Sequence, residues 1–141
     1  MMTPLALALV CVFLQVALTF WAIVRVGMLR VAAVNTQAVT LEQIALSSAA
    51  YPPRVIAQQN NMQNQFETPV LLYSVVALAA ALDAANWGLA AGAAVFVALR
   101  FVHRYIHVGR NDVVLRLKVY VAGLAGLSVS WLSLGVALFG G

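Results

Sequence analysis

The sequence predicts an all-α integral membrane protein, a four-transmembrane-helix up-down bundle. Two observations carry this prediction. Hydrophobic residues make up 64% of the 141 residues and charged residues only 9%, far below the roughly 25% typical of soluble domains. The apolar residues also gather into long runs, separated by short stretches that hold nearly all of the charges. We expect a single domain over residues 1–141, with helices at about 3–29, 55–82, 84–108 and 113–139.

The first apolar run has the length and flanks of a transmembrane helix. Residues Thr3 to Val24 form 22 positions without a charge, and about 20 residues cross the hydrocarbon core. A secretory signal would carry positive charge before this run and a small-residue cleavage site after it. Here Arg25 and Arg30 follow the run, so we expect a first span whose N-terminus lies on the non-cytoplasmic side.

The other apolar runs predict a helical hairpin and a last span. Residues 68–82 and 84–99 are separated only by Asp83 and the turn-forming residues after it, and a further run begins at residue 119. The segment 31–53, between the first two spans, is polar and long enough to hold a short helix.

All eight basic residues fall around the first loop or around the last one, which the four-span topology places at one end of the bundle. They are Arg25, Arg30, Arg54, Arg100, Arg104, Arg110, Arg116 and Lys118. The positive-inside rule assigns this end to the cytoplasm, so both termini are expected on the non-cytoplasmic side. Because the charges form no contiguous basic patch, the sequence does not favour nucleic acid as a partner.

The stretch QQNNMQNQFETPVLLY, residues 58–73, runs amide side chains directly into an apolar span. Spacings of four and three place Asn60, Asn64 and Glu67 on one stripe of a helix. A polar stripe inside a membrane is expected to face the bundle interior rather than lipid.

Glu67 and Arg100 are expected at similar depth on adjacent helices. Fifteen residues separate Glu67 from Asp83, and sixteen separate Asp83 from Arg100. An intramembrane charge is tolerated when it faces the bundle interior and has a partner. We therefore predict that Glu67 and Arg100 form a pair.

Two more polar stripes complete a predicted cavity at the cytoplasmic end. Arg100, His103 and His107 share one face of the third span, and Arg116 and Tyr120 lie four residues apart on the fourth. The plainer role of any single amide is to join helices, at about 0.6 to 2 kcal/mol each. The number of converging donors nevertheless favours an anionic ligand.

A metal site is not expected among these residues. His103 and His107 share a helical face, but the sequence has no HExxH glutamate and few carboxylates to complete a ligand set. The cationic side chains of Arg100 and Arg104 would also oppose a bound cation.

Several of these motifs resemble those of one membrane protein family. An Ala-Gln-x-Asn run begins at Ala57, a proline follows soon after, Arg-x-x-His begins at Arg100, and Arg-x-x-x-Tyr begins at Arg116. With four spans in about 140 residues, this combination resembles the MAPEG family, the membrane-associated proteins in eicosanoid and glutathione metabolism. The pattern NNxxNxFExPVLxY at residues 60–73 is similar to an uncharacterised bacterial branch.

The resemblance implies a homotrimer that binds glutathione between subunits near the cytoplasmic face and admits a lipophilic small-molecule substrate from the bilayer, here that of the bacterial inner (plasma) membrane. It implies Arg116 as the stabiliser of the glutathione thiolate, because a nearby cation lowers a thiol's pKa from about 8.5, and Tyr120 as a supporting catalytic donor. The cofactor-binding candidates are Asn60, Asn61, Asn64, Glu67, Arg100, His103 and His107.

The chain departs from the catalytic members of that family near the asparagine. Those members carry glutamate three residues later, where this chain has Gln63 or Asn64, depending on whether Asn60 or Asn61 is aligned. The carboxylate appears one helical turn further on, as Glu67. Two hypotheses follow. The protein is a glutathione-dependent transferase, isomerase or peroxidase acting on lipophilic electrophiles, or it is a non-catalytic membrane scaffold or accessory subunit of a larger membrane complex.

Overall fold

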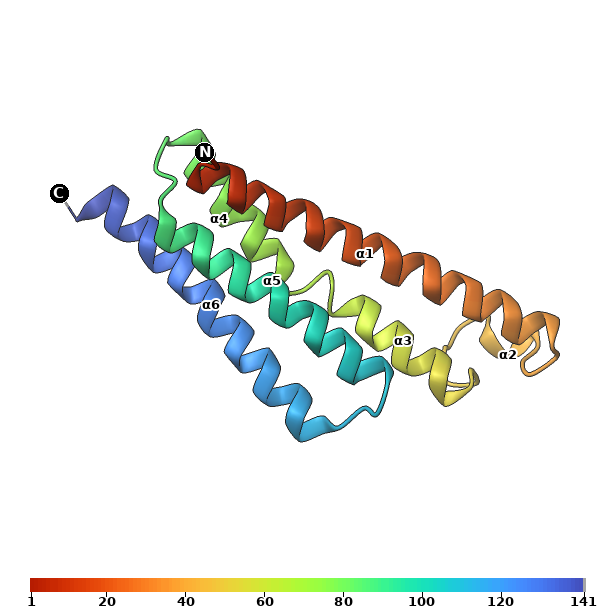
Figure 1. The fold of residues 1–141 in the computed structure, drawn as a ribbon. Coiled ribbons are helices and arrows are strands. Elements are labelled where there is room, and N and C mark those ends of the chain that lie inside the picture. Colours follow the sequence, from red (N-terminus) through yellow and green to blue (C-terminus); the bar gives the residue numbers. More distant parts are fainter. Residues whose placement is uncertain (141) are drawn as a thin grey trace.

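The computed structural model describes residues 1–140, and its helices have the length and composition of a membrane protein. The elements are α1 (Pro4–Asn35), α2 (Leu41–Ile44), α3 (Pro53–Gln63), α4 (Pro69–Ala81), α5 (Trp87–Val108) and α6 (Val113–Phe139) (Figure 1). By length and composition α1, α5 and α6 can each cross a membrane, whereas α4 is a shorter apolar helix. The first helix continues to Asn35 instead of ending near residue 29.

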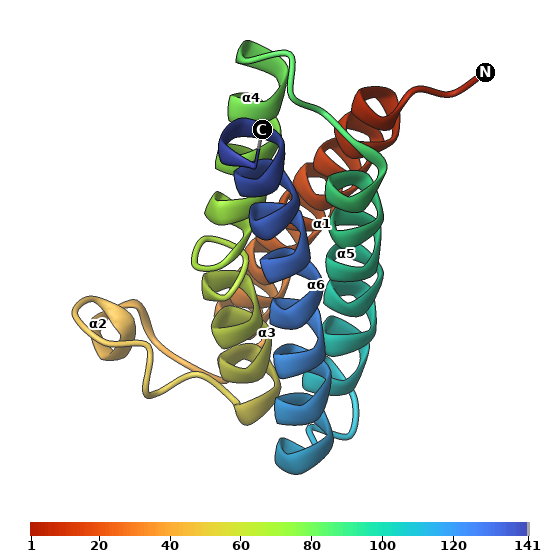
Figure 2. The ribbon, with the colours of Figure 1, turned by 90° about the vertical axis from the view of Figure 1, so that its left-hand side faces the viewer.

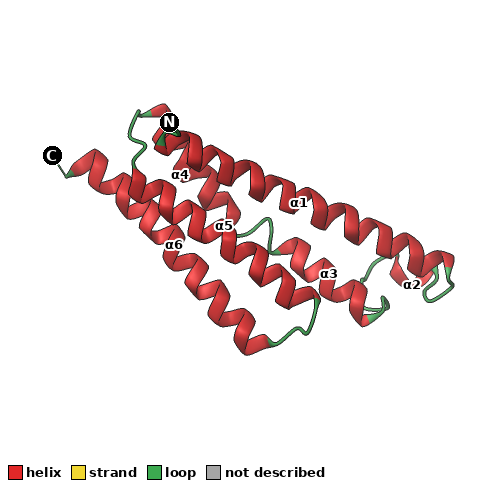
Figure 3. Ribbon diagram, viewed as in Figure 1, coloured by secondary structure: helices red, strands yellow, loops and turns green. Residues whose placement is uncertain are grey.

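The predicted helix 55–82 is wrong in one respect, because it is broken in the middle. Residues 64–68 form a turn between α3 and α4, visible as the loop that joins them in Figure 3. Pro69 is the first residue of α4, and a proline ring lacks the N–H and clashes with the carbonyl four residues earlier. Both half-length helices run alongside α1 (Figure 1), while α3 also contacts α5 and α4 also contacts α6.

Side-chain caps fix where three of the long helices begin. Thr3 Oγ1 accepts a hydrogen bond from the Ala6 amide at 3.1 Å at the start of α1. Asn86 caps α5 and Asp112 caps α6 in the same way. Each cap satisfies an amide that has no partner within its own helix.

The most extensive helix contact in the bundle lies between α5 and α6 and includes close approaches at glycines. A Cβ atom added at Gly92 would lie 2.5 Å from the backbone oxygen of Gly126 and 2.8 Å from the backbone nitrogen of Ser130. Small residues let membrane helices approach until their backbones touch. The Oγ of Ser130 also donates to the carbonyl oxygen of Leu89 at 2.9 Å, which ties the two helices at this point.

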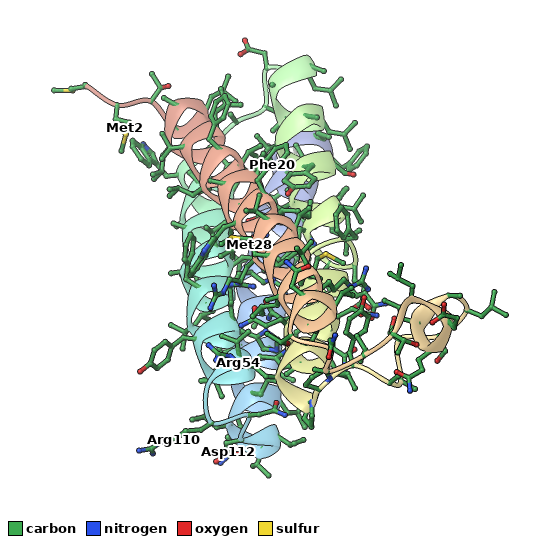
Figure 4. All side chains as sticks on the ribbon, turned by 90° about the vertical axis from the view of Figure 1, so that its right-hand side faces the viewer. Met2, Phe20, Met28, Arg54, Arg110 and Asp112 are labelled. Atoms are coloured by element: carbon green, nitrogen blue, oxygen red, sulfur yellow. The ribbon has the colours of Figure 1, made fainter. Side chains whose placement is uncertain are left out.

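The two ends of the bundle differ in charge. Both termini lie at the end that also holds the α4–α5 connection (Figure 1). Figure 4 shows Arg54, Arg110 and Asp112 at the end remote from Met2. We call the end that carries Arg54 and Arg110 the basic end.

The segment between α1 and α3 contains the short helix that the sequence allowed. Thr40 and Gln43 form a capping box around α2: the Gln43 amide donates to Thr40 Oγ1, and the Thr40 amide donates to Gln43 Oε1. We call residues 36–52 the loop arm. In Figure 2 its short helix α2 stands to one side of the bundle.

Candidate functional site

A polar pocket of about 250 Å³ lies between the α3–α4 turn, α5 and α6. Asn64 and Glu67 reach it from the turn, His103 from α5, and Arg116 and Tyr120 from α6. Two apolar side chains of α6, Val113 and Leu117, complete the lining. Five of the nine site residues expected from the sequence therefore meet in one pocket, which we call the polar pocket.

The groups in the polar pocket differ in charge and in how far they are already hydrogen-bonded. The guanidinium of Arg116 donates to Asn111 Oδ1 at 2.8 Å from an accessible position. The ring of His103 lies 5.9 Å from that of Tyr120, centroid to centroid. Within residues 1–140, His103 Nδ1 is buried without a hydrogen-bond partner. This nitrogen can act as donor or acceptor according to the tautomer of the ring.

The predicted pair between Glu67 and Arg100 is wrong. The Nη2 of Arg100 donates instead to the backbone oxygen of Asn64 and, at 3.0 Å, to Oε1 of Gln65. Equal distance from the hairpin placed the two charges at similar depth, but the broken helix turns Glu67 to the exposed side of the turn. Arg100 therefore stabilises the turn, because it donates to the Asn64 carbonyl, which the end of α3 leaves without a helical partner.

A second cluster, the buried polar network, lies behind the turn, between α1, α3 and α5. Gln15 Nε2 donates to Gln65 Oε1 at 3.0 Å, and Gln65 Nε2 donates to the Asn61 carbonyl oxygen at 3.2 Å. The amide of Gln65 is therefore hydrogen-bonded at both ends inside the protein: its oxygen accepts from Gln15 and Arg100, and its nitrogen donates to the Asn61 carbonyl. We include in the network the buried residues Gln15, Gln58, Asn61, Gln65, Arg100 and Arg104.

Arg104 is the other buried cation of this network. Its guanidinium donates to Asn61 Oδ1 and, at 3.3 Å, to Gln58 Oε1. The same group lies 4.4 Å from the centre of the Trp21 ring, an arrangement that stabilises a cation by the ring's quadrupole. Asn61 Nδ2 also lies 3.5 Å from Nδ1 of His107. These amides bind side chains of their own chain and are not free for a ligand.

The inward-facing stripe of α3 differs from the predicted one. Asn60 and Gln63 are exposed, whereas Gln58, Asn61 and Gln65 point inward. The inward-facing residues are spaced by three and four, and the predicted stripe of Asn60, Asn64 and Glu67 is spaced by four and three. Both spacings fit one face of a helix, so periodicity alone does not distinguish the two stripes. Gln15, which belongs to the buried polar network, was also not predicted from the sequence. The feature that could have indicated it is that Gln15 is the single amide in the charge-free run of the first span.

The structure therefore divides the predicted site into two parts. Asn64, Glu67, His103, Arg116 and Tyr120 line the polar pocket, and Asn61, Arg100 and His107 lie in or against the buried polar network. Asn60 belongs to neither. Among the described residues, no group of three or more His, Cys, Asp or Glu side chains could hold a metal ion.

These features define an integral membrane protein with a helical bundle: three apolar helices of spanning length, a fourth that is shorter, and buried cations at one end. The model of the MAPEG family matches residues 8–136. The chain belongs to the MAPEG family, as the resemblance of its motifs suggested. It matches no curated protein and no solved structure significantly.

Proposed function

We propose that the protein is a glutathione-dependent enzyme, a transferase, isomerase or peroxidase that acts on lipophilic electrophiles. The observation that carries this proposal is the polar pocket, in which Arg116 and Tyr120 of α6 meet Asn64 and Glu67 of the turn. A cation, a carboxylate, an amide and a hydroxyl from segments far apart in sequence share one cavity. Such convergence of polar groups in a concave site is typical of small-molecule binding.

Two residues of the pocket also have the asparagine-to-glutamate spacing that Asn60 and Asn61 lack. Catalytic members of the family carry glutamate three residues after the asparagine, and Glu67 follows Asn64 by three. Both line the polar pocket, whereas Asn60 is exposed and Asn61 bonds Arg104. An alignment on Asn64 therefore supports the enzyme hypothesis more strongly than one on Asn60 or Asn61.

The charges of the pocket fit glutathione, a tripeptide with two carboxylates, one ammonium group and a thiol. Arg116 can hold an anionic group, and Glu67 can accept hydrogen bonds from the ammonium. Asn64 offers a further polar contact, and His103 forms part of the pocket lining. Glutathione would supply the nucleophilic sulfur, which reacts as the thiolate.

Arg116 and Tyr120 would make that thiolate available. A guanidinium near the sulfur lowers the thiol's pKa because the positive charge favours the anion. A hydrogen bond from the Tyr120 hydroxyl to the sulfur would act in the same direction. Bound glutathione would lose its thiol proton to solvent at the open side of the pocket, and its sulfur would supply the electron pair for the new bond to the electrophile.

The assembly that we propose is a homotrimer in the bacterial inner membrane, with the basic end on the cytoplasmic side and both termini opposite. The excess of arginine at that end supports the orientation. Glutathione would then reach the polar pocket from the cytoplasm, where a neighbouring subunit would close it, and the lipophilic substrate would arrive through the bilayer.

The proposal predicts that glutathione stabilises the detergent-purified protein and that Arg116→Ala removes this effect. Thermal unfolding is measured over millimolar glutathione, and stabilisation should grow as RT ln(1 + [L]/Kd). The control is Arg110→Ala, which removes an exposed arginine at the same end outside the pocket lining. It should respond as the unaltered protein does.

One result would favour the alternative, a non-catalytic scaffold or accessory subunit: an unaltered protein that glutathione does not stabilise. Equal stabilisation of the Arg116→Ala variant would instead show that glutathione binds without Arg116, and it would overturn the role proposed for that residue. The observation behind the alternative is the buried polar network, whose amides already join α1, α3 and α5.

Arg100 is expected to affect glutathione binding without touching glutathione. Arg100→Gln removes the donors that hold the Asn64 carbonyl and the Gln65 side chain, so the turn no longer fixes Asn64 and Glu67. We expect the Kd for glutathione to rise about tenfold, equivalent to about 1.4 kcal/mol. Lys118→Gln, an exposed change on α6, is the control. An unchanged Kd in a folded Arg100→Gln protein would show that the turn holds its shape unaided.

A further inference from the structure

The loop arm carries two leucines that the described residues, 1–140, leave largely exposed. The side chain of Leu46 is fully exposed, and that of Leu41 is 66% exposed. Figure 2 shows α2, which begins at Leu41, to one side of the bundle, and Figure 1 shows it beside the C-terminal end of α1. Large apolar side chains gathered on a projecting segment commonly mark an interaction surface.

The arm is held firmly on its inner side. Val39 and Tyr51, near its two ends, are buried in a small apolar cluster with Ala33 of α1 and Val55 of α3. Because both ends are anchored by packing, the outward position of its leucines is a property of the fold.

The contacts of the arm also fix its depth relative to the membrane. From Pro4, about 20 residues of α1 cross about 30 Å of hydrocarbon, and the first charge, Arg25, follows directly. Arg30 lies about 7.5 Å further along the helix axis. The Arg30 guanidinium is 5.5 Å from the centre of the Tyr51 ring, which ties the arm to the level of Arg30.

That level is the outer edge of the headgroup layer, which extends about 5 to 7.5 Å beyond the hydrocarbon on each side. A segment that projects sideways at this level lies along the membrane surface. Arg30 and Arg54 flank the arm, while its own single charge is Glu42. Cations at the level of the headgroups attract anionic lipids.

We propose that the loop arm is a membrane-interface anchor, which inserts Leu41 and Leu46 among the lipids of the leaflet at the basic end and favours anionic headgroups. Apolar side chains of a surface segment enter the boundary between headgroups and acyl chains, and nearby arginines bind the phosphates. The anchor fixes the level of α1 and α3 in the membrane. It does not depend on glutathione binding.

Spin labels measure this position directly. Cys11 is the single cysteine, so Cys11→Ala allows one nitroxide label at Leu46→Cys. The protein is placed in nanodiscs of phosphatidylcholine, alone or with roughly a third phosphatidylglycerol, and collisions with oxygen and with a water-soluble nickel chelate are compared. Arg110→Cys, at an exposed position at the same end, is the aqueous reference, and Phe13→Cys, 72% exposed on α1, is the lipid reference.

We expect the oxygen-to-nickel collision ratio at residue 46 to be several-fold higher than at residue 110 and nearer to that at residue 13. Phosphatidylglycerol should raise it further, and Arg54→Gln should reduce that increase. A ratio equal to that at residue 110 would overturn the proposal by placing the arm in water. Low collision rates with both reagents would also overturn it, because they would show a second copy of the protein covering the leucines.

Discussion

Replacing Asn61 by leucine is expected to lower the free energy of unfolding by about 3 kcal/mol, one of the two largest effects that the structure predicts. Asn61 is fully buried, and its Oδ1 accepts from the guanidinium of Arg104, which is 2% exposed. Leucine has a similar branched shape and a larger volume, and it has no acceptor. The buried cation would keep only Gln58 and the Trp21 ring, and removing one partner of a buried charge costs more than the pair contributes.

The neighbouring residue provides the matched control. Asn60→Leu makes the same chemical change at an exposed position and should alter stability by less than about 0.5 kcal/mol. Adding Arg104→Met to Asn61→Leu should recover part of the loss, because the cation that lacked a partner is gone. Unfolding in a denaturing detergent titration measures all three variants. Equal losses at residues 60 and 61 would contradict the inward stripe described for α3.

The second large effect is expected at Gly92, where Gly92→Ala should destabilise the protein by about 2 to 3 kcal/mol. The added methyl group would meet the backbone oxygen of Gly126 at 2.5 Å, and a backbone atom cannot move aside as a flexible side chain can. The α5–α6 contact would have to open along its length, and the Ser130 bond to Leu89 would lengthen. Thermal unfolding in detergent measures the change.

Gly135→Ala, on α6, tests the same substitution without the clash, since nothing lies within 4 Å of the added Cβ. Alanine is the better helix former by about 0.5 to 1 kcal/mol, so this variant should be slightly more stable than the unaltered protein. The two substitutions therefore have opposite expected signs. A Gly92→Ala protein as stable as Gly135→Ala would show that α5 and α6 lie further apart than described.

The spans could be predicted from the sequence because apolar run lengths and charge positions report directly on a membrane. The helix break could not, although Pro69 was visible, because proline also occurs inside membrane helices. Its position depends on Arg100 reaching the Asn64 carbonyl, a contact between residues 36 positions apart. That residues 1–141 form one domain stays a prediction.

The candidate site was predicted in part for a related reason. His103, Arg116 and Tyr120 lie on unbroken helices, where sequence spacing determines which face of the helix a side chain occupies. All three line one pocket. The amides near the break were harder to place, because a one-residue change of stripe exchanges Asn60 for Asn61. The role of Arg100 depends on which partner it reaches, and equal depth did not distinguish Glu67 from the Asn64 carbonyl.

The broken helix also constrains how the chain enters the membrane during synthesis. The 13 residues of α4 reach only about 20 Å, too short to be recognised as a span alone, and the amide-rich α3 cannot extend it as an apolar segment. We expect α4 and α5 to insert together, because only the short connection around Asp83 separates them. Arg100, which donates to the Asn64 carbonyl at the break, lies on α5. The helix that follows α4 directly would therefore supply this donor, and no later helix would be needed.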